Sequence, residues 1–461
     1  MPSAPRQLPK VTFESLQRAH ETAVTPYAHL MRWEKLSEAK LFFDANSDEA
    51  LKAEWEEHAS GVRPIIPHTL PSLLSDFISI KRQHGSAVER ALYADMTPLN
   101  LVTRLMHRRP LAFLCARDSW LTRHGLSGDG GWETVGTDRE QPPLLLEKFL
   151  SYDEIALSAL VSVAVPTHFV NKGDRMNRGK PGEEGSFERK GVYAGCVGAR
   201  FERDDGLMEW AHLVVTPEQN TIAKGYGAGT APPPPPIPAG DAPAEEDVEM
   251  PQADAVITAS KEERRLLLKA WARFYGKEYL PTHEEAVAAE AASPGTYMKL
   301  RKRPNCYLDI ALYKQRIRSV AMPYLLDAQY RAQESGATAY VHVVGLGLGV
   351  WMVDTRQGPL IVDVYAELLK ELSLPNIGVL DFSWFPKECI RCGGARSGDV
   401  FKLAAGTAGG ANNNGDAAVV APASTPKIIF SKRNPADPLP QRSPEEPPWL
   451  LVAMYAWDGN S

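Results

Sequence analysis

Cysteine is scarce in this sequence, with five residues among 461. This number is too small for a disulfide scaffold of this size, and an odd count favours a reducing compartment. Long apolar runs are also missing, because no stretch approaches the about 18 to 20 residues of a membrane-spanning helix. The N-terminal segment MPSAPRQLPKVTFESLQ lacks the apolar core of a secretion signal. We therefore expect a cytoplasmic or nuclear protein without a membrane partner.

An excess of either charge is absent as well. The 51 Lys and Arg residues oppose 57 Asp and Glu residues, giving a net charge of −6. This balance gives no electrostatic reason to expect a nucleic-acid partner. Hydrophobic residues make up 44% and charged residues 23% of the chain, which is typical of a globular protein and excludes a fully disordered chain.

Composition divides the chain. Residues 230–255 run TAPPPPPIPAGDAPAEEDVEMPQADA, and such a segment cannot bury enough apolar surface to fold, so we predict a disordered tether. An Ala-, Gly- and Asn-rich stretch at 404–426 is typical of a surface insertion. The predicted segments are a mostly helical region over 1–165, a hairpin-containing part of the core over 166–229, the tether over 230–255, and an α/β core over 256–461.

Hydrophobic spacing predicts the first elements. Apolar residues recur at helical intervals over 50–58, 70–83, 87–95 and 99–106. Further on, residues 191–201 and 208–215 are rich in β-branched and aromatic side chains, and polar residues separate them. This pattern predicts a β-hairpin.

The pattern then changes to alternating strand and helix. A buried strand is predicted at Ala339–Val344, a helix at Pro359–Leu372 and a second strand at Ile377–Phe385. Strand, loop, helix and strand form a βαβ unit, which predicts an α/β sheet. Later strands are expected at Lys427–Phe430 and Leu450–Tyr455.

A glycine-rich loop, Gly345-Leu-Gly-Leu-Gly349, joins the first strand to the helix. Glycines let backbone N–H groups approach an anion, and the following helix contributes its positive end. The spacing fits neither a P-loop nor the Rossmann fingerprint. Two interpretations stay open here: a phosphate or pyrophosphate site, and glycines that only permit a tight turn.

Acidic residues near this loop are candidates for chemistry. Asp381 interrupts an apolar strand, where a carboxylate needs either a hydrogen-bond partner or a function. Asp363 lies early in the predicted helix, and Asp458 and Asn460 follow the last strand. Asp381 facing solvent and Asp458 in a simple turn are the alternatives. Cys389 and Cys392 make at best half of a zinc site, so no metal is predicted.

The run AYVHVVGLGLGVWMVDTRQGPLIVDVYAELLKEL, with IGVLDFSWF after it, resembles the second ligand loop of macrodomains, which bind ADP-ribose. The closer likeness is to a group of macrodomain-like ADP-ribosyl hydrolases that includes the Legionella effector MavL and eukaryotic relatives. The tail YAWDGNS resembles the segment that this group has in place of the Asn-Ala-Ala-Asn loop of ordinary macrodomains. The likeness is specific over 338–385 and 449–461.

This resemblance implies a macrodomain-like mixed sheet flanked by helices, with an added helical N-terminal region. It further implies a mono-ADP-ribosyl glycohydrolase that removes ADP-ribose from modified protein side chains, namely arginine, without a cofactor. Hydrolysis of a glycosidic bond uses carboxylates to direct water and to stabilise developing positive charge. The implied catalytic residues are Asp381, Asp363 and Asp458, and the implied ADP-ribose-binding residues are Gly345, Gly347, Leu348, Gly349, Val350, Trp351 and Asn460.

Three alternatives stay open at this point. The first is a macrodomain-like reader that binds ADP-ribose without hydrolysing it. Another is a nucleotide-dependent enzyme of different chemistry. The third is a scaffold whose proline-rich residues 232–238 engage an SH3- or WW-type partner.

Overall fold

The computed structural model describes residues 12, 14–15, 49–108, 112–114, 118–122, 125–174, 180–201, 207–229, 261–402 and 425–457. Residues 230–255, predicted as a tether, lie outside this part, as does most of the predicted insertion. Asp458 and Asn460 also lie outside the described residues.

A seven-stranded sheet forms the centre of the protein, in the order β1-β5-β6-β15-β10-β11-β14. The strands are β1 Arg63–Ile65, β5 Ser162–His168, β6 Lys190–Cys196, β10 Thr338–Val344, β11 Ile377–Ser383, β14 Lys427–Ser431 and β15 Trp449–Ala456. From β6 to β14 the neighbours are parallel, whereas β5 is antiparallel to both β1 and β6. The sheet is therefore mixed and mostly parallel, and the predicted α/β class is confirmed.

The predicted βαβ unit is present as β10, helix α12 (Gln357–Glu371) and β11. Strand β10 is an almost continuous apolar run because it is covered on both faces. Pro359 lies in the first turn of α12, where its missing N–H costs no hydrogen bond.

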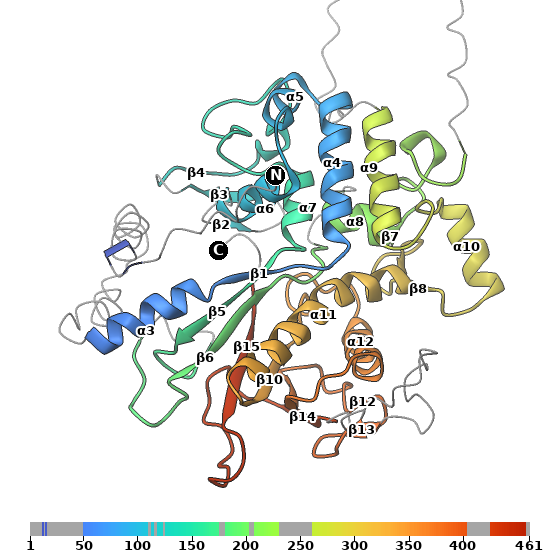
Figure 1. Ribbon diagram of the computed structural model, residues 1–461. Helices are drawn as coiled ribbons and strands as arrows, with labels where there is room; N and C mark the ends of the chain where they lie inside the picture. Colours follow the sequence, from blue (N-terminus) through green and yellow to red (C-terminus); the bar gives the residue numbers. More distant parts are fainter. Residues whose placement is uncertain are drawn as a thin grey trace, which may run out of the picture.

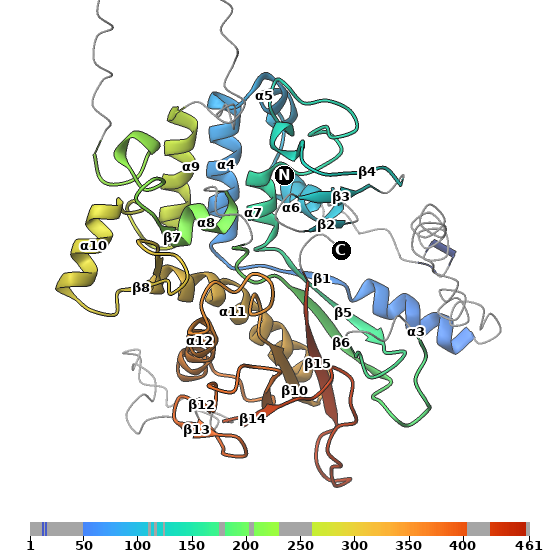
Figure 2. The same ribbon diagram turned by 180° about the vertical axis from the view of Figure 1, so that it is seen from behind.

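Helices cover one face of the sheet, and loops cover the other (Figures 1 and 2). Helix α11 (Ile310–Glu334) lies beside α12 on one face, and its Tyr324 hydroxyl is 2.9 Å from the carbonyl oxygens of both His342 and Val452. Phe169 and Phe187 pack with Tyr340 and Leu451 on the other face. None of the helices in the described part of the chain has the length and apolar character that a membrane span requires.

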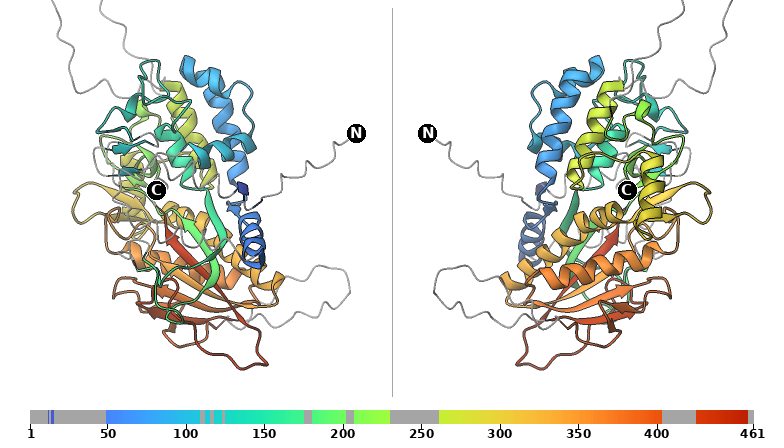
Figure 3. Two further views of the ribbon diagram at one scale, coloured as in Figure 1. Left: turned by 90° about the vertical axis from the view of Figure 1, so that its left-hand side faces the viewer. Right: turned by 90° about the vertical axis from the view of Figure 1, so that its right-hand side faces the viewer.

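The predicted helices before residue 110 are all present. They are α3 Glu49–Ser60, α4 Leu70–His84, α5 Ala87–Tyr93 and α6 Pro98–His107. Together with α7 (Tyr152–Ser158), α8 (Met208–Leu213) and α9 (Lys261–Phe274), helices α4 to α6 gather at one end of the sheet (Figure 3). The same stretch of chain also supplies β1 and β5 to the central sheet, so its strands complete the α/β core.

The structure also has two short 3-10 helices, Trp132–Thr134 and Ile222–Lys224, and in addition three small sheets and one further α-helix. Their elements are β2 Ala112–Leu114, β3 Ser119–Leu121, β4 Ser127–Gly128, β7 Val214–Val215, β8 Tyr297–Lys299, β9 Tyr307–Asp309, β12 Arg391–Cys392, β13 Ala395–Arg396 and α10 His283–Ala292.

The strand predicted over residues 208–215 is wrong for most of its length. Residues 208–213 form helix α8, and only Val214 and Val215 are extended, pairing with β9. Every residue of α8 is buried. A short helix enclosed on all sides has no polar face, so its sequence carries no helical periodicity. Strand β6 pairs instead with β5 and β15.

Candidate functional site

Four parallel strands end together at one edge of the central sheet. Val344 of β10 lies opposite Ser383 of β11, His342 opposite Ala453 of β15, and Ala456 opposite Cys196 of β6. The chain leaves β10 as the glycine-rich loop, which in the structure also includes Val350 and Trp351 and so runs from Gly345 to Trp351. In open α/β sheets, ligands bind outside the carboxyl ends of such strands. This edge is therefore the candidate site.

The glycine-rich loop offers free backbone donors. Its fold is held by hydrogen bonds from Leu346 N to Val344 O (2.9 Å) and from Leu348 N to Gly345 O (3.1 Å). In the described part of the chain, the amides of Gly349, Val350 and Trp351 donate no hydrogen bond. Val350 is 85% exposed. Consecutive unpaired N–H groups in an exposed turn suit an anion.

The loop rests on the segment that follows β6. A Cβ atom on Gly198 would lie 2.4 Å from the backbone nitrogen of Gly347, so only glycine allows this approach. Gly347 itself has φ +72°, a backbone conformation that favours glycine. The segment after β6 is in turn stabilised by Arg316 of α11, which is buried. Its Nη2 donates to the carbonyl oxygens of Val197 and Gly198 at 3.2 and 3.1 Å.

The far end of the loop is joined to α12. The Oε1 atom of Gln357 accepts from the amides of Val353 and Asp354 at 2.8 and 3.0 Å. Arg356 pairs with Asp354, Nη2 to Oδ2, at 2.8 Å. The hydrogen bonds and positive charge of Arg356 lower the pKa of the Asp354 carboxyl to about 2. Asp354 is therefore a loop anchor that is ionised at neutral pH.

Trp351 connects the loop to residues that the sequence did not point to. Its side chain is buried, and its indole Nε1 has no partner among the described residues. The guanidinium carbon of Arg200 lies 5.8 Å from the centre of the Trp351 ring. Arg200 Nη2 is 3.2 Å from Asp118 Oδ1, and Asp118 also accepts from the Tyr152 hydroxyl. Asp118 and Arg200 are 82 positions apart, so no local pattern could have predicted their pairing.

The structure brings the predicted ADP-ribose-binding residues from Gly345 to Trp351 together in this one loop. The Leu348 side chain covers Gly345, where an added Cβ would lie 2.6 Å from Leu348 Cδ1. Asn460 lies outside the described residues. Ligand contact by these residues stays a prediction.

Asp381 has found the hydrogen-bond partners that a buried carboxylate needs. It is 1% exposed and accepts from the hydroxyls of Tyr340 (2.8 Å) and Ser431 (2.7 Å). His342 lies opposite it on β10, and burial lowers the pKa of His342 to about 4, so this ring is neutral. Both carboxylate oxygens of Asp381 therefore accept hydrogen bonds within the sheet, Oδ2 from Tyr340 and Oδ1 from Ser431. The Ser383 hydroxyl also lies 3.3 Å from Oδ1.

Asp363 lies in different surroundings. Its side chain is 57% exposed on α12, 3.8 Å from Lys314 Nζ. Phe382 contacts Tyr365 of α12, and successive strand residues point to opposite faces, so Asp381 points away from that helix. The structure does not bring Asp363 and Asp381 together. Their catalytic roles, and that of Asp458, stay predictions.

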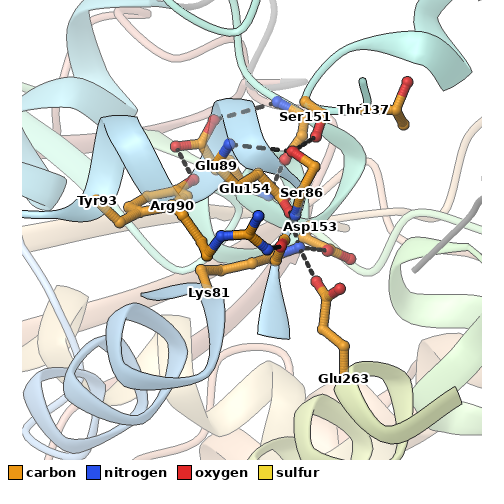
Figure 4. A network of polar contacts seen from close by, with 12 residues as sticks. Lys81, Ser86, Glu89, Arg90, Tyr93, Thr137, Ser151, Asp153, Glu154 and Glu263 are labelled. Carbon is orange, nitrogen blue, oxygen red and sulfur yellow. Dashed lines mark hydrogen bonds and ion pairs between the residues drawn. The ribbon is translucent and has the colours of Figure 1, made fainter. Parts of the chain in front are cut away.

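Away from this edge, a cavity of about 110 Å³ lies among helices α4, α5, α7, α8 and α9. Lys81 is at its centre, with Nζ 2.7 Å from Glu89, 2.7 Å from Asp153 and 2.6 Å from Glu263 (Figure 4). These three carboxylates lie close enough to hold a metal ion, but the ammonium of Lys81 takes the central position. The cluster therefore serves as an ion-pair network that ties α9 to the helices before residue 160.

Charge is unevenly distributed in this network. Burial disfavours the charged ammonium of Lys81, but its three carboxylate partners outweigh this effect and raise the pKa of Lys81 well above its ordinary value. Burial also raises the pKa of Glu89 to about 7, against the opposing effect of Lys81. Asp153 differs: its pKa is lowered, because the nearby Lys81 outweighs the effect of burial.

Comparisons with known proteins extend the similarity over nearly the whole chain. Residues 44–461 match the family of MavL-like ADP-ribosylhydrolases. The chain is 34% identical over 427 residues to the ADP-ribosylarginine hydrolase CG3568 of Drosophila melanogaster, covering 89% of this chain and 72% of the fly protein. It is 32% identical over 412 residues to the ADP-ribosylarginine hydrolase CG2909 of the same organism, covering 89% and 71%.

Proposed function

Because the chain belongs to the MavL-like ADP-ribosylhydrolase family, we propose that it removes ADP-ribose from arginine side chains of modified proteins. The names of the two fly relatives support arginine as the modified residue. The observation that carries the proposal is the glycine-rich loop, in which the amides of Gly349 to Trp351 donate no hydrogen bond among the described residues and lie beyond the carboxyl end of β10.

The same topology supports a macrodomain-like core. The glycine-rich loop, which resembles a macrodomain ligand loop, follows β10, the tail that resembles a segment of the hydrolase group follows β15, and these strands are parallel neighbours. This arrangement supports a single ligand site at the carboxyl ends of both strands. Residues 338–385 would supply the loop that binds the diphosphate, and the tail from Trp457 onward would supply residues near the glycosidic bond that is hydrolysed.

In this proposal the loop amides bind the diphosphate through charge-assisted hydrogen bonds. Binding energy gained there, away from the reacting bond, orients the ribose that is attached to arginine. The bond between the ribose C1 and the guanidino nitrogen breaks, the oxygen of water bonds to C1, and one water proton passes to the departing nitrogen. The products are ADP-ribose and unmodified arginine.

A carboxylate is needed to direct the water and to stabilise the positive charge on the ribose. Asp381 is occupied inside the sheet, and Asp363 is exposed beside Lys314. Asp458 directly follows Trp457 in the sequence, and Trp457 packs against Trp351 and its neighbours. We therefore propose Asp458 as the first carboxylate to test.

The test follows release of labelled ADP-ribose from an ADP-ribosylarginine protein. The protein should release the label, and Asp458→Asn should lose this activity. Glu367→Gln, an exposed carboxylate variant on α12, is the matched control and should keep it. ADP-ribose at about 100 times its dissociation constant should stabilise the fold by about 2.7 kcal/mol. Stabilisation without release would favour a reader, and no thermal shift at millimolar ADP-ribose would contradict both functions.

A further inference from the structure

The end of the glycine-rich loop is held by a chain of contacts that begins in the N-terminal region. Trp351 is the last residue of the loop, and it packs with Ala159, Val197 and the partly buried Trp457. The guanidinium group of Arg200 lies over the Trp351 ring, 5.8 Å from its centre. A buried cation facing an aromatic ring gains more than an exposed one, because little water competes for the charge.

Asp118 fixes this guanidinium group. The pair is nearly inaccessible to solvent, since Arg200 is 3% and Asp118 0% exposed, and Nη2 lies 3.2 Å from Oδ1. Asp118 precedes β3, and its carboxylate also accepts from Tyr152, the first residue of α7. The residue before β3 and the first residue of α7, both in the N-terminal region, thus meet at the carboxylate that orients Arg200.

The backbone at Asp118 adds a further sign of constraint. Its φ is +48°, a left-handed conformation that is uncommon for any residue except glycine and is best tolerated by Asn and Asp. Strained residues persist where surrounding contacts hold them, and they are frequent near functional sites. Here the strain places the carboxylate between Arg200 and Tyr152.

We propose that Arg200, held by Asp118, is a positioning residue that sets the conformation of the glycine-rich loop through Trp351. The N-terminal region is then part of the ligand site although it supplies no loop residue. Its effect on ADP-ribose affinity rests on the proposed function. Its effect on the order of the loop does not, and the two can be measured separately.

The variant to test is the double substitution Arg200→Met and Asp118→Asn. It removes both charges of this pair together, so neither partner is left with the other's charge missing, and asparagine still accepts the left-handed backbone. Hydrogen exchange is read at the amides of Leu346, Leu348 and Met352, which donate hydrogen bonds within or beside the loop. We expect exchange at least about tenfold faster and ADP-ribose affinity about tenfold weaker, equivalent to about 1.4 kcal/mol.

A second buried pair of the same kind provides the control. Arg104 Nε lies 2.6 Å from Glu154 Oε1, and Arg104→Met with Glu154→Gln removes it in the same charge-balanced way. This control should lower the melting temperature but leave the three loop amides protected. Unchanged exchange in the Arg200 variant, or equally faster exchange in the control, would overturn the proposal. Failure of the unaltered protein to bind ADP-ribose would overturn the proposed function alone.

Discussion

Gly347 and Gly349 lie two residues apart in the same loop but differ in what a side chain would meet. At Gly347 the backbone has φ +72°, and an added Cβ would lie 3.0 Å from the carbonyl oxygen of Ala199. A bulky residue there is strained in the protein itself, whether or not a ligand binds. At Gly349 nothing lies within 4 Å of an added Cβ, so a substitution there acts on the ligand alone.

We therefore expect Gly349→Val to keep the melting temperature of the parent protein while weakening ADP-ribose binding. Losing two amide contacts to phosphate, at roughly 1.5 to 3 kcal/mol each, corresponds to about two to four orders of magnitude in affinity. Gly347→Val should lower both melting temperature and affinity. Thermal melting and calorimetric titration separate the two effects, and unaltered affinity in Gly349→Val would contradict the phosphate cradle.

At the scale of elements, the network around Lys81 makes the packing of α4, α5, α7 and α9 sensitive to pH. Glu89 of α5 has a folded-state pKa of about 7, raised by burial from an ordinary value of 4.5. A raised carboxyl pKa means that its contribution to stability is complete below about pH 4.5 and is lost as the pH rises through 7.

Glu89→Gln removes this titration while keeping an oxygen that can accept from Ser86 N, as Glu89 does. Relative to the parent, the variant should gain free energy of unfolding between pH 5 and pH 8, by at most about 3 kcal/mol at about 1.4 kcal/mol per pKa unit. Denaturant unfolding across that range measures the gain. Glu262 provides the control, because it neighbours Glu263 in the sequence but is exposed, and its hydrogen bond with Arg265 lowers its pKa. Glu262→Gln should therefore show no gain in free energy of unfolding between pH 5 and pH 8. A pH-independent difference between Glu89→Gln and the parent would refute the assignment.

At the scale of the whole molecule, the long segment before α9 joins two places that are already close. An added Cβ on Gly225 would lie 3.1 Å from the Cα of Arg265, so the chain on either side of residues 230–260 is brought together by the fold. Loop length then enters stability only logarithmically. Replacing residues 231–254 by a short Gly/Ser linker should leave the melting temperature and ADP-ribose affinity nearly unchanged.

Thermal melting and ligand titration of this deletion test that prediction, and a Gly/Ser segment of the original length is its control. Loss of folded protein in the deletion but not in the control would show that length is required. Binding of SH3 or WW domains to residues 232–238 stays a prediction, and it should disappear in both altered proteins.

The sequence alone determined those parts of the fold that depend on near neighbours. Helices α4 to α6 follow from apolar spacing and from the proline at the start of α6, and β10, the glycine-rich loop, α12 and β11 follow from runs of contiguous residues. The resemblance to the hydrolase family rests on the same contiguous segments, and for that reason it could be recognised without a structure.

Only the tertiary structure decided what depends on distant residues. Helix α8 is set by burial on every side, and Asp381 is a buried acceptor because Tyr340 and Ser431 come to it from other strands. The network at Lys81 and the contacts among Asp118, Arg200 and Trp351 join residues far apart in the chain. Such contacts leave no periodic or local trace in a sequence, since folding alone brings the partners together.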